Sequence, residues 1–516
     1  MPFFDFHCHP GLKPQFSDPA KKPSPWQYIN AKLRIVKDIK LRINALFNEV
    51  LNSQSSLEML AQNDVKLIGL VLHAPEKKVG VGLGEKKIVN TGAVELIDVK
   101  QLKYIAAGTH SFELINEELN WLLTATPSVS GKKLKILQRA ADFDETDSSS
   151  VFAAIIVEGL HCFHDDPDAP DAKKAFNNNF NSFTSRYPVI AINVCHMQQN
   201  KFCNHAYGMQ FLKPGYFYPE QSGITNWGRE VIQQMIDKKI LTDIKHMSLK
   251  ARWELYSWFQ DEDDETKFIQ PLVCTHAGTT GLSIAHKAEY LLQEITDKGT
   301  VYEVVHAKPR SRHFDDVYHN CSSINLYDED IEKILLSGGI IGMSFDQRIL
   351  GFADENVIAE LNTPHDVEYI NHAEADFFLG PQPLDIPVRP ADETTWAAED
   401  FAELSPADFP FAHCRFLVNN IIHILWVAGR HDKIGFAKAA RQICLGTDFD
   451  GLINAIDCCK TTADLASFKQ RMKADLVVGL QKIGAGSLDA SDFLEDIFYR
   501  NGRDFMLGRL RALRGG

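Results

Sequence analysis

The chain is divided by short, continuously apolar runs that end in polar residues or glycine. Runs of this kind, rich in β-branched residues, are typical of strands that are buried on both faces of a parallel sheet. We expect eight such strands, at Phe3–His9, Val65–Pro75, Val151–His161, Val189–His196, Leu241–Ser248, Phe268–His276, Gly339–Phe345 and Gln442–Gly451.

Helical patterns lie between most of these runs. Clear examples precede the fifth, seventh and eighth strands, at Arg229–Lys239, Asp328–Ser337 and Arg415–Arg430. Eight strands that alternate with helices predict an α/β fold of the (β/α)₈ or TIM-barrel type, in which the active site lies at the carboxyl ends of the strands. We expect residues 1–516 to form one such barrel domain.

The length of the chain predicts insertions in this barrel. A TIM barrel typically needs about 250 residues, and the chain has 516. Two long segments, 76–150 and 350–412, follow the second and seventh strands, so both should extend from the face that carries the site. The segment 350–412 is rich in proline and acidic residues, which suits a lid. A peripheral or oligomer-forming excursion fits the same composition.

Composition and charge narrow the classes of partner. The chain is 45% hydrophobic and 24% charged, as globular proteins are, and its net charge of −14 argues against nucleic acid or an anionic membrane as partner. We see no signal-peptide pattern and no apolar run near the roughly 20 residues that span a bilayer, so we expect a cytoplasmic protein. The ten cysteines include no CxxC pair, which predicts reduced, buried thiols.

The strongest local motif is Asp5-Phe-His7-Cys-His9, at the end of the first strand. Side chains two positions apart on a strand point to the same face, so His7 and His9 can share one metal ion. Cys8 should point the other way. The alternative interpretation of this motif, taken alone, is two solvated histidines near a chain terminus.

Polar side chains also end five other apolar runs, where a simple core would not place them. A carboxylate after four apolar residues is costly unless it is paired or bound to metal, and any single one of these groups is more often structural than functional. Their recurrence at the ends of so many strands predicts that they converge on one site. They are Glu158, His196, His246, His276 and Asp448.

The ordered series of motifs resembles the membrane (renal) dipeptidase family of the amidohydrolase superfamily of metal-dependent hydrolases. The similarity runs in order from residue 3 to about residue 508, interrupted by the two insertions. Its pieces are the His7–His9 pair, Val-Glu158-Gly159, Asn193-Val-Cys-His196 with Asn200 and Asn204, Gly223-Ile-Thr-Asn-Trp-Gly228, Asp243-Ile-Lys-His246-Met-Ser248, Thr275-His276, Asn325-Leu-Tyr-Asp328, Gly446-Thr-Asp448-Phe-Asp450-Gly451 and Asn501-Gly-Arg503.

The resemblance implies a site with two divalent ions. His7 and His9 would bind the first ion, His246 and His276 the second, and Glu158 would bridge both. The resemblance also places Asp448 at the metal site as the acid–base group beside a bridging water, and His196 and Asn200 at the substrate. Zinc is the expected ion for imidazole and carboxylate ligands, with manganese or iron as alternatives.

The activity that the resemblance implies is hydrolysis of an amide or peptide bond in a small-molecule or dipeptide-like substrate by a metal-bridging hydroxide, in a protein that forms a homodimer. The same hydroxide could instead attack a lactone, an ester or a cyclic amide. A phosphoesterase that opens with Asp-x-His-x-His fits the later motifs less well. A non-catalytic metal-binding barrel is disfavoured because all six metal-site positions hold competent side chains.

The chain departs from the family pattern at three positions. His9 stands where the family usually has Asp, which removes one negative charge from the site. Lys245 replaces a serine before His246, and strand alternation predicts that it points away from the metal. Ile324 stands where dipeptidases have the arginine that holds the substrate carboxylate.

The absence of that arginine predicts a change in specificity. Arg310 and Arg312 lie in the preceding segment and are candidate substrate-binding replacements. Because an unpaired, desolvated carboxylate binds poorly, we expect dipeptides with a free carboxyl terminus to be poor substrates. Better substrates would lack the carboxylate, or present it to Arg310, Arg312 or the segment 350–412.

Overall fold

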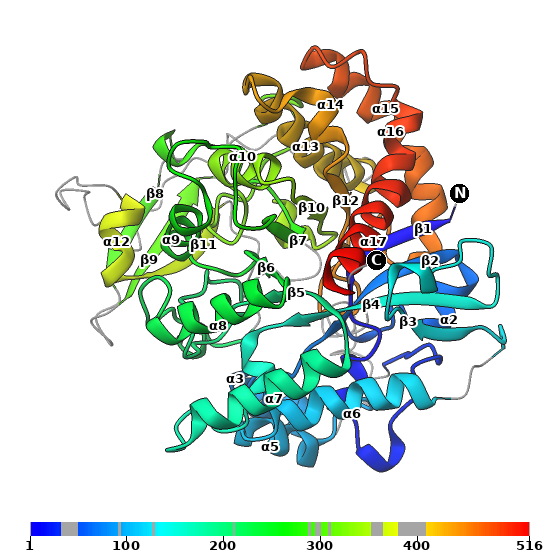
Figure 1. The fold of residues 1–516 in the computed structure, drawn as a ribbon, viewed down its shortest axis with the longest axis vertical. Helices are drawn as coiled ribbons and strands as arrows, with labels where there is room; N and C mark the ends of the chain where they lie inside the picture. The colour runs from blue at the N-terminus through cyan, green and yellow to red at the C-terminus, as the bar shows by residue number, and fades with distance from the viewer. Residues whose placement is uncertain are drawn as a thin grey trace.

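The computed structural model describes residues 2–31, 50–90, 94–125, 129–209, 212–286, 290–294, 301–307, 311–351, 365–379 and 409–514. Eight parallel strands form a nearly closed barrel with helices between them (Figure 1), as the sequence predicts. In spatial order they are β1 (Phe3–Cys8), β2 (Val65–Leu72), β4 (Ser150–Glu158), β5 (Val189–Asn193), β6 (Leu241–Asp243), β7 (Val273–Ala277), β10 (Ile340–Met343) and β12 (Ile443–Leu445).

The barrel closes where the last strand meets the first. Cys8 forms a parallel bridge with Phe449, just beyond β12. The backbone N–H of His9 donates to the carbonyl of Phe449 over 2.8 Å, and the N–H of Asp448 donates to the carbonyl of His7, also over 2.8 Å. This closing seam therefore brings residues from the two distant ends of the chain to one edge of the site.

The amino end of the barrel is filled by a compact apolar core. Each barrel strand contributes to it, with Phe4, Leu67, Phe152, Ile190, Leu241, Val273, Ile340 and Cys444. Helix α17 (Asn501–Arg514) packs on the same core through Met506 and Leu510, and contacts β1, β5 and β12 (red in Figure 1). Because α17 closes this end, the opposite end of the barrel is left for a site.

The three helices predicted from the sequence are present, as α8 (Asn226–Asp237), α10 (Asp328–Leu336) and α13 (Phe409–Arg430). Helix α8 shows why they form. Thr225 caps it by accepting from the N–H of Gly228, and Val231, Ile232 and Met235 form its buried face. The other helices beside the barrel strands are α2 (Leu57–Gln62), α7 (Ala172–Arg186), α9 (Leu249–Phe259), α14 (Gly435–Ala440), α15 (Leu465–Lys482) and α16 (Ala490–Glu495).

The segment 76–150 adds helices and one strand after β2. Its elements are α3 (Lys77–Glu85), α4 (Lys87–Asn90), α5 (Val99–Ala107), α6 (Ser111–Thr124) and β3 (Lys133–Ile136). Strand β3 pairs in parallel with β4, an addition to the barrel sheet that the apolar runs do not predict.

A second, antiparallel sheet stands apart from the barrel strands in Figure 1. It consists of β8 (Tyr290–Glu294), β9 (Val301–Ala307) and β11 (His365–Asn371), in the order β11-β9-β8. Helix α12 (His372–Leu379) contacts β9 and β11 of this sheet, and the short helix α11 (Gln347–Leu350), which follows β10, contacts α13. Most of the predicted lid segment 350–412 lies outside the described residues, so its role as a lid stays a prediction.

Two expectations about chemistry and environment can be compared with the fold. All ten cysteines are free thiols in buried positions, as their place in apolar runs predicts. Among the described helices, none combines the length and the apolar composition that a bilayer crossing requires.

Candidate metal centre

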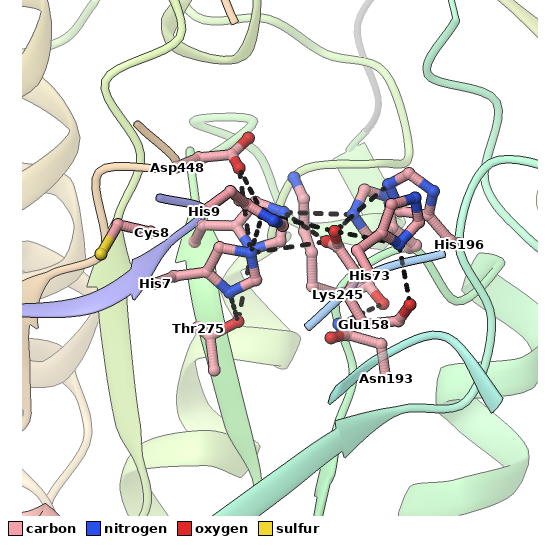
Figure 2. Close-up of polar contacts among 12 residues, drawn as sticks. His7, Cys8, His9, His73, Glu158, Asn193, His196, Lys245, Thr275 and Asp448 are labelled. Atoms are coloured by element: carbon pink, nitrogen blue, oxygen red, sulfur yellow. Dashed lines mark hydrogen bonds and ion pairs between the residues drawn. The ribbon is translucent and has the colours of Figure 1, made fainter. Parts of the chain in front are cut away.

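The histidines predicted as metal ligands come together in two pairs at the carboxyl end of the barrel (Figure 2). The Nε2 atoms of His7 and His9 lie 3.1 Å apart, and those of His246 and His276 also lie 3.1 Å apart. In a tetrahedral zinc site with Zn–N bonds near 2.1 Å, neighbouring ligand nitrogens stand about 3.4 Å apart. Each pair therefore has the spacing of two imidazoles that chelate one ion.

The first strand places its two histidines as the sequence predicts. His7 and His9 extend from β1 to one side, and Cys8 extends to the other (Figure 2). The Cys8 side chain packs in the hydrophobic core outside the barrel. The register between β1 and β2 is irregular between Asp5 and Cys8, and an irregularity of this kind re-aims side chains at a strand end.

Glu158, the last residue of β4, lies between the two histidine pairs. Its Oε1 is 3.5 Å from Nε2 of His7, 3.2 Å from Nε2 of His246 and 3.6 Å from Nε2 of His276, and its Oε2 is 3.5 Å from Nε2 of His9. One carboxylate thus faces both pairs. Four imidazoles and a shared carboxylate are a donor set that fits two divalent ions.

The protonation of the histidines suits metal binding. Burial lowers the pKa of His9, His246 and His276 well below the usual range, so these rings are neutral and offer a lone pair. Burial also lowers the pKa of His7, but the carboxylates of Glu158, Asp448 and Asp243 together outweigh burial and raise that pKa. A ring nitrogen must be unprotonated to bind a cation. Because the pKa of His7 is raised, metal binding would release a proton from this ring.

Outer residues fix the tautomer of His7. Thr275 Oγ1 donates to the Asp243 carboxylate and lies 2.8 Å from His7 Nδ1. Because the hydroxyl proton is used on Asp243, Thr275 accepts a hydrogen bond from Nδ1, and Nε2 is the nitrogen of His7 that would lose its proton and bind an ion.

Asp448 stands over the first histidine pair. Its Oδ1 is 3.3 Å from Nε2 of His9 and 3.8 Å from Nε2 of His7. Burial raises the pKa of Asp448 to about 7, with a further rise from Glu158 that His7 opposes. By contrast, the pKa of Glu158 is held well below its usual range, because His196, His246 and His7 outweigh its burial. The two carboxylates are therefore suited to different tasks, proton transfer for Asp448 and permanent charge for Glu158.

The backbone leaves the extended conformation where it presents two of these groups. His246 has φ +69° and Asp448 has φ +63°, values that are uncommon for residues other than glycine. Nearby, Gly451 allows a close approach, because a Cβ at this position would fall on Oδ1 of Asp448. Strained or crowded backbone of this kind is concentrated at functional sites.

Gly451→Ala should therefore lower activity by displacing Asp448. A displacement of about 1 Å can reduce turnover by up to roughly 100-fold, while the metal ligands remain. Steady-state kinetics with metal analysis would measure this effect. The matched control is Gly486→Ala, because a Cβ on Gly486 meets nothing within 4 Å. Equal activity of the two variants would show that the position of Asp448 does not limit turnover.

A cavity beside the candidate metal site is lined by Glu158, Lys245, His246 and Asp448, and His196 lines it as well. Its Nε2 is 3.7 Å from Oε2 of Glu158, and its Nδ1 is hydrogen-bonded to Glu76. Glu76 also lies 3.3 Å from Nε2 of His73. The sequence analysis missed His73 and Glu76, although both follow the apolar run of β2 and so carry the signal that identified the other residues.

Lys245 contradicts the expectation from strand alternation. Its side chain is buried, lines the cavity together with His246 and Asp448, and passes between the two histidine groups in Figure 2. Strand β6 ends at Asp243, and the N–H of Met247 turns back to the carbonyl of Ile244, so alternation no longer applies at Lys245. Burial lowers the pKa of this ammonium, against the nearby carboxylate of Asp448.

Two predicted substrate contacts do not reach the cavity. Oδ1 of Asn200 accepts from the N–H groups of Phe202 and Cys203, over 2.8 and 3.0 Å, and so shapes its own loop. Arg312 is exposed, with its guanidinium 5.0 Å from the centre of the Trp426 ring. Arg310 lies outside the described residues. The arginine that does line the cavity is Arg348, which the sequence analysis did not single out.

The fold and the site together define a class: a (β/α)₈ barrel whose strand ends carry a cluster of histidines and carboxylates that could hold metal ions. No family model matches the chain, and no curated protein matches its sequence.

Solved structures are similar to the chain over nearly its whole length. They include the dipeptidase AC, a metallopeptidase (14% identity, TM-score 0.47, covering 100% of this chain and 99% of that one). Another is the probable dipeptidase PvdM from Pseudomonas aeruginosa (13%, 0.49, 99% and 96%). A third is a metallopeptidase from Rhodobacter sphaeroides, liganded with a phosphinate mimic of L-Ala-D-Ala (13%, 0.45, 99% and 99%). At these identities and TM-scores, the case for function rests on the side chains of the site.

Proposed function

We propose that this protein is a binuclear metal-dependent hydrolase that cleaves an amide or peptide bond in a small substrate. The observation that carries the proposal is the position of Glu158, whose two oxygens lie 3.2 to 3.6 Å from the Nε2 atoms of the two histidine pairs. A carboxylate buried among four imidazoles is costly in a purely structural role, but it is the expected bridge between two ions.

Two divalent ions, when bound, would make hydroxide available near neutral pH and would act as Lewis acids toward a carbonyl. We assign zinc as the metal, because imidazole and carboxylate are ligands that suit it. His7 and His9 would hold one ion, His246 and His276 the other, and Glu158 both.

The chain's own groups supply the remaining chemistry. Asp448 lies within 3.8 Å of both His7 and His9, where its carboxylate can accept a proton from the attacking water and deliver it to the leaving nitrogen. His196 lines the cavity, and its Nε2 can donate to the oxygen that becomes negative as the carbonyl is attacked. Glu76 is bonded to Nδ1 of His196 and so orients that donor.

Metal analysis and a substrate panel would test this proposal. We expect close to two divalent ions per purified chain, hydrolysis of dipeptides or related amides, loss of that activity on chelation, and its return when zinc is added. The panel should include esters, lactones and cyclic amides. Hydrolysis of one of those classes, but not of amides, would show that the bond cleaved is not an amide. A metal-loaded chain that hydrolyses nothing in the panel would contradict the proposal that the protein is a hydrolase.

A further inference from the structure

Lys245 is the one cavity residue whose charge the described part of the chain leaves unmatched. Its side chain is only 1% exposed, and its Nζ donates one hydrogen bond, over 3.3 Å, to the carbonyl of Ile324. Within the described ranges no carboxylate stands at ion-pair distance from this Nζ. A buried ammonium has three donors and costs free energy unless an anion meets it.

The other cation of the cavity is already neutralised. The Nε atom of Arg348 donates to both oxygens of Asp346, over 3.0 Å each. The guanidinium and this carboxylate therefore cancel, and the pair adds little net charge to the cavity. By comparison, Lys13, another buried lysine near the site, has Asp450 2.7 Å from its Nζ. Lys245 differs from both because none of the carboxylates in the described ranges, Asp448 included, lies within ion-pair distance of its Nζ.

The surroundings of Lys245 favour an organic anion. Ile324, Tyr207 and Gly208 line the cavity together with Lys245. Gly208 leaves room for the Ile324 side chain, because a Cβ at this position would meet Cδ1 of Ile324 over 2.5 Å. An apolar wall lowers the local dielectric and so strengthens a contact between opposite charges.

We infer that Lys245 binds a carboxylate of the substrate, so that the preferred substrates are amides that carry a free carboxylate in the part that faces Ile324. This inference rests on the proposed hydrolase function and names its substrate class. It reverses the expectation drawn from Ile324, because the cation missing at position 324 is supplied from the neighbouring strand end. The hydrogen bond from Nζ to the carbonyl of Ile324 sets the ammonium at that wall.

The test compares alanyl-alanine with alanyl-alaninamide, which differ only in the carboxylate. We expect the metal-loaded wild type to prefer the free acid in kcat/KM. In Lys245→Met that preference should fall about 10- to 100-fold, the usual loss for a hydrogen bond to a charged group. Lys245→Arg, which keeps the charge, should retain most of the preference. Metal content and thermal unfolding of each variant show that the ions and the fold remain.

Arg312→Met tests the alternative, because the sequence analysis names Arg312 as a candidate for binding the substrate carboxylate. A loss of preference in that variant instead of Lys245→Met would overturn the inference. If added acetate stimulates hydrolysis of alanyl-alaninamide, Lys245 binds a separate anion and not a carboxylate of the substrate. That result would also overturn the inference. Equal rates for the two substrates in the wild type would do the same, and would leave the hydrolase proposal standing.

A binding measurement separates the inference from the proposed reaction. In 4-oxopentanoate, a CH₂ group replaces the amide NH of N-acetylglycine, so the compound cannot be hydrolysed. Calorimetry should show that the wild type binds it more tightly than 4-oxopentanamide, and that Lys245→Met removes the difference. If this holds while no amide is hydrolysed, the hydrolase proposal fails and the carboxylate site stands.

Discussion

Glu158→Gln is expected to release both metal ions and to abolish turnover. The amide of glutamine has the same shape but carries no charge, and only one of its two terminal atoms can bind a cation. Loss of an outer partner of a metal ligand costs roughly 10- to 100-fold in affinity, so loss of a ligand shared by two ions should cost at least the upper end, about 100-fold for each. Metal analysis after dialysis, together with kinetics at saturating zinc, measures both losses.

Asp330→Asn is the matched control, because it also neutralises a buried carboxylate. Asp330 on α10 lies 3.2 Å from Nη2 of Arg252 and accepts from the hydroxyl of Tyr256, and it does not line the cavity. We expect that variant to lose stability but to keep its ions. A Glu158→Gln protein with two ions and normal rates would contradict the bridging role.

Asp448→Asn is expected to keep the metal ions and to lose most turnover. The four histidines and Glu158 remain, so the ions should stay bound. An asparagine cannot accept the proton that Asp448 is proposed to transfer, and loss of such an acid–base group costs roughly 100-fold or more in kcat. The measurement is kcat at full metal occupancy, with the metal content of the same sample.

The nearest alternative base is Asp450, and its contacts argue against it. Its carboxylate lies 2.7 Å from Nζ of Lys13 and accepts from the backbone N–H groups of Gln54 and Ser55. Both oxygens of this carboxylate are thus already occupied by partners within the protein, which leaves neither directed at a water in the cavity. Near-normal turnover in Asp448→Asn would nevertheless move the base to another group, and Asp450→Asn would then be the next variant to measure.

The barrel could be predicted from the sequence because its strands are buried on both faces. A strand such as β4, with the run Val-Phe-Ala-Ala-Ile-Ile-Val, has an apolar side chain at each of these positions whichever face it occupies. The signal is therefore strong within each run. Strands β9 and β11 of the antiparallel sheet carry no continuous apolar run. They form by pairing with each other across a long stretch of sequence, which a search for local runs does not detect.

The strand ends were predicted too long for a physical reason that concerns the site itself. The predicted runs Leu241–Ser248 and Gln442–Gly451 end as strands at Asp243 and Leu445. Beyond these points the backbone turns, and His246 and Asp448 adopt positive φ. The candidate ligands do lie just beyond strand ends, but the direction of the side chains next to them could not be derived from strand alternation. This is why the side chain of Lys245 lines the cavity, although strand alternation predicts that it points away.

The convergence of the candidate ligands could be predicted because these are unusual residue types at strand ends, while the other polar residues that line the cavity could not. Arg348 and Glu76 act through partners that are close only in the folded chain, Asp346 and His196. Asn200 had the right residue type in the right motif, but its side chain is used by its own loop.

The seam between β12 and β1 implies that the candidate metal centre is completed late in folding. Asp5 accepts hydrogen bonds from Thr447 across 442 positions of sequence, and the backbone bonds of His7 and His9 at the same seam join equally distant segments. Contacts of such long range form slowly, after local structure. During synthesis, His7 and His9 can contact Asp448 only after nearly the whole chain has been made. A truncated or partly folded chain would therefore lack part of the candidate ligand set. Metal ions would then bind, and so stabilise, only the fully folded barrel.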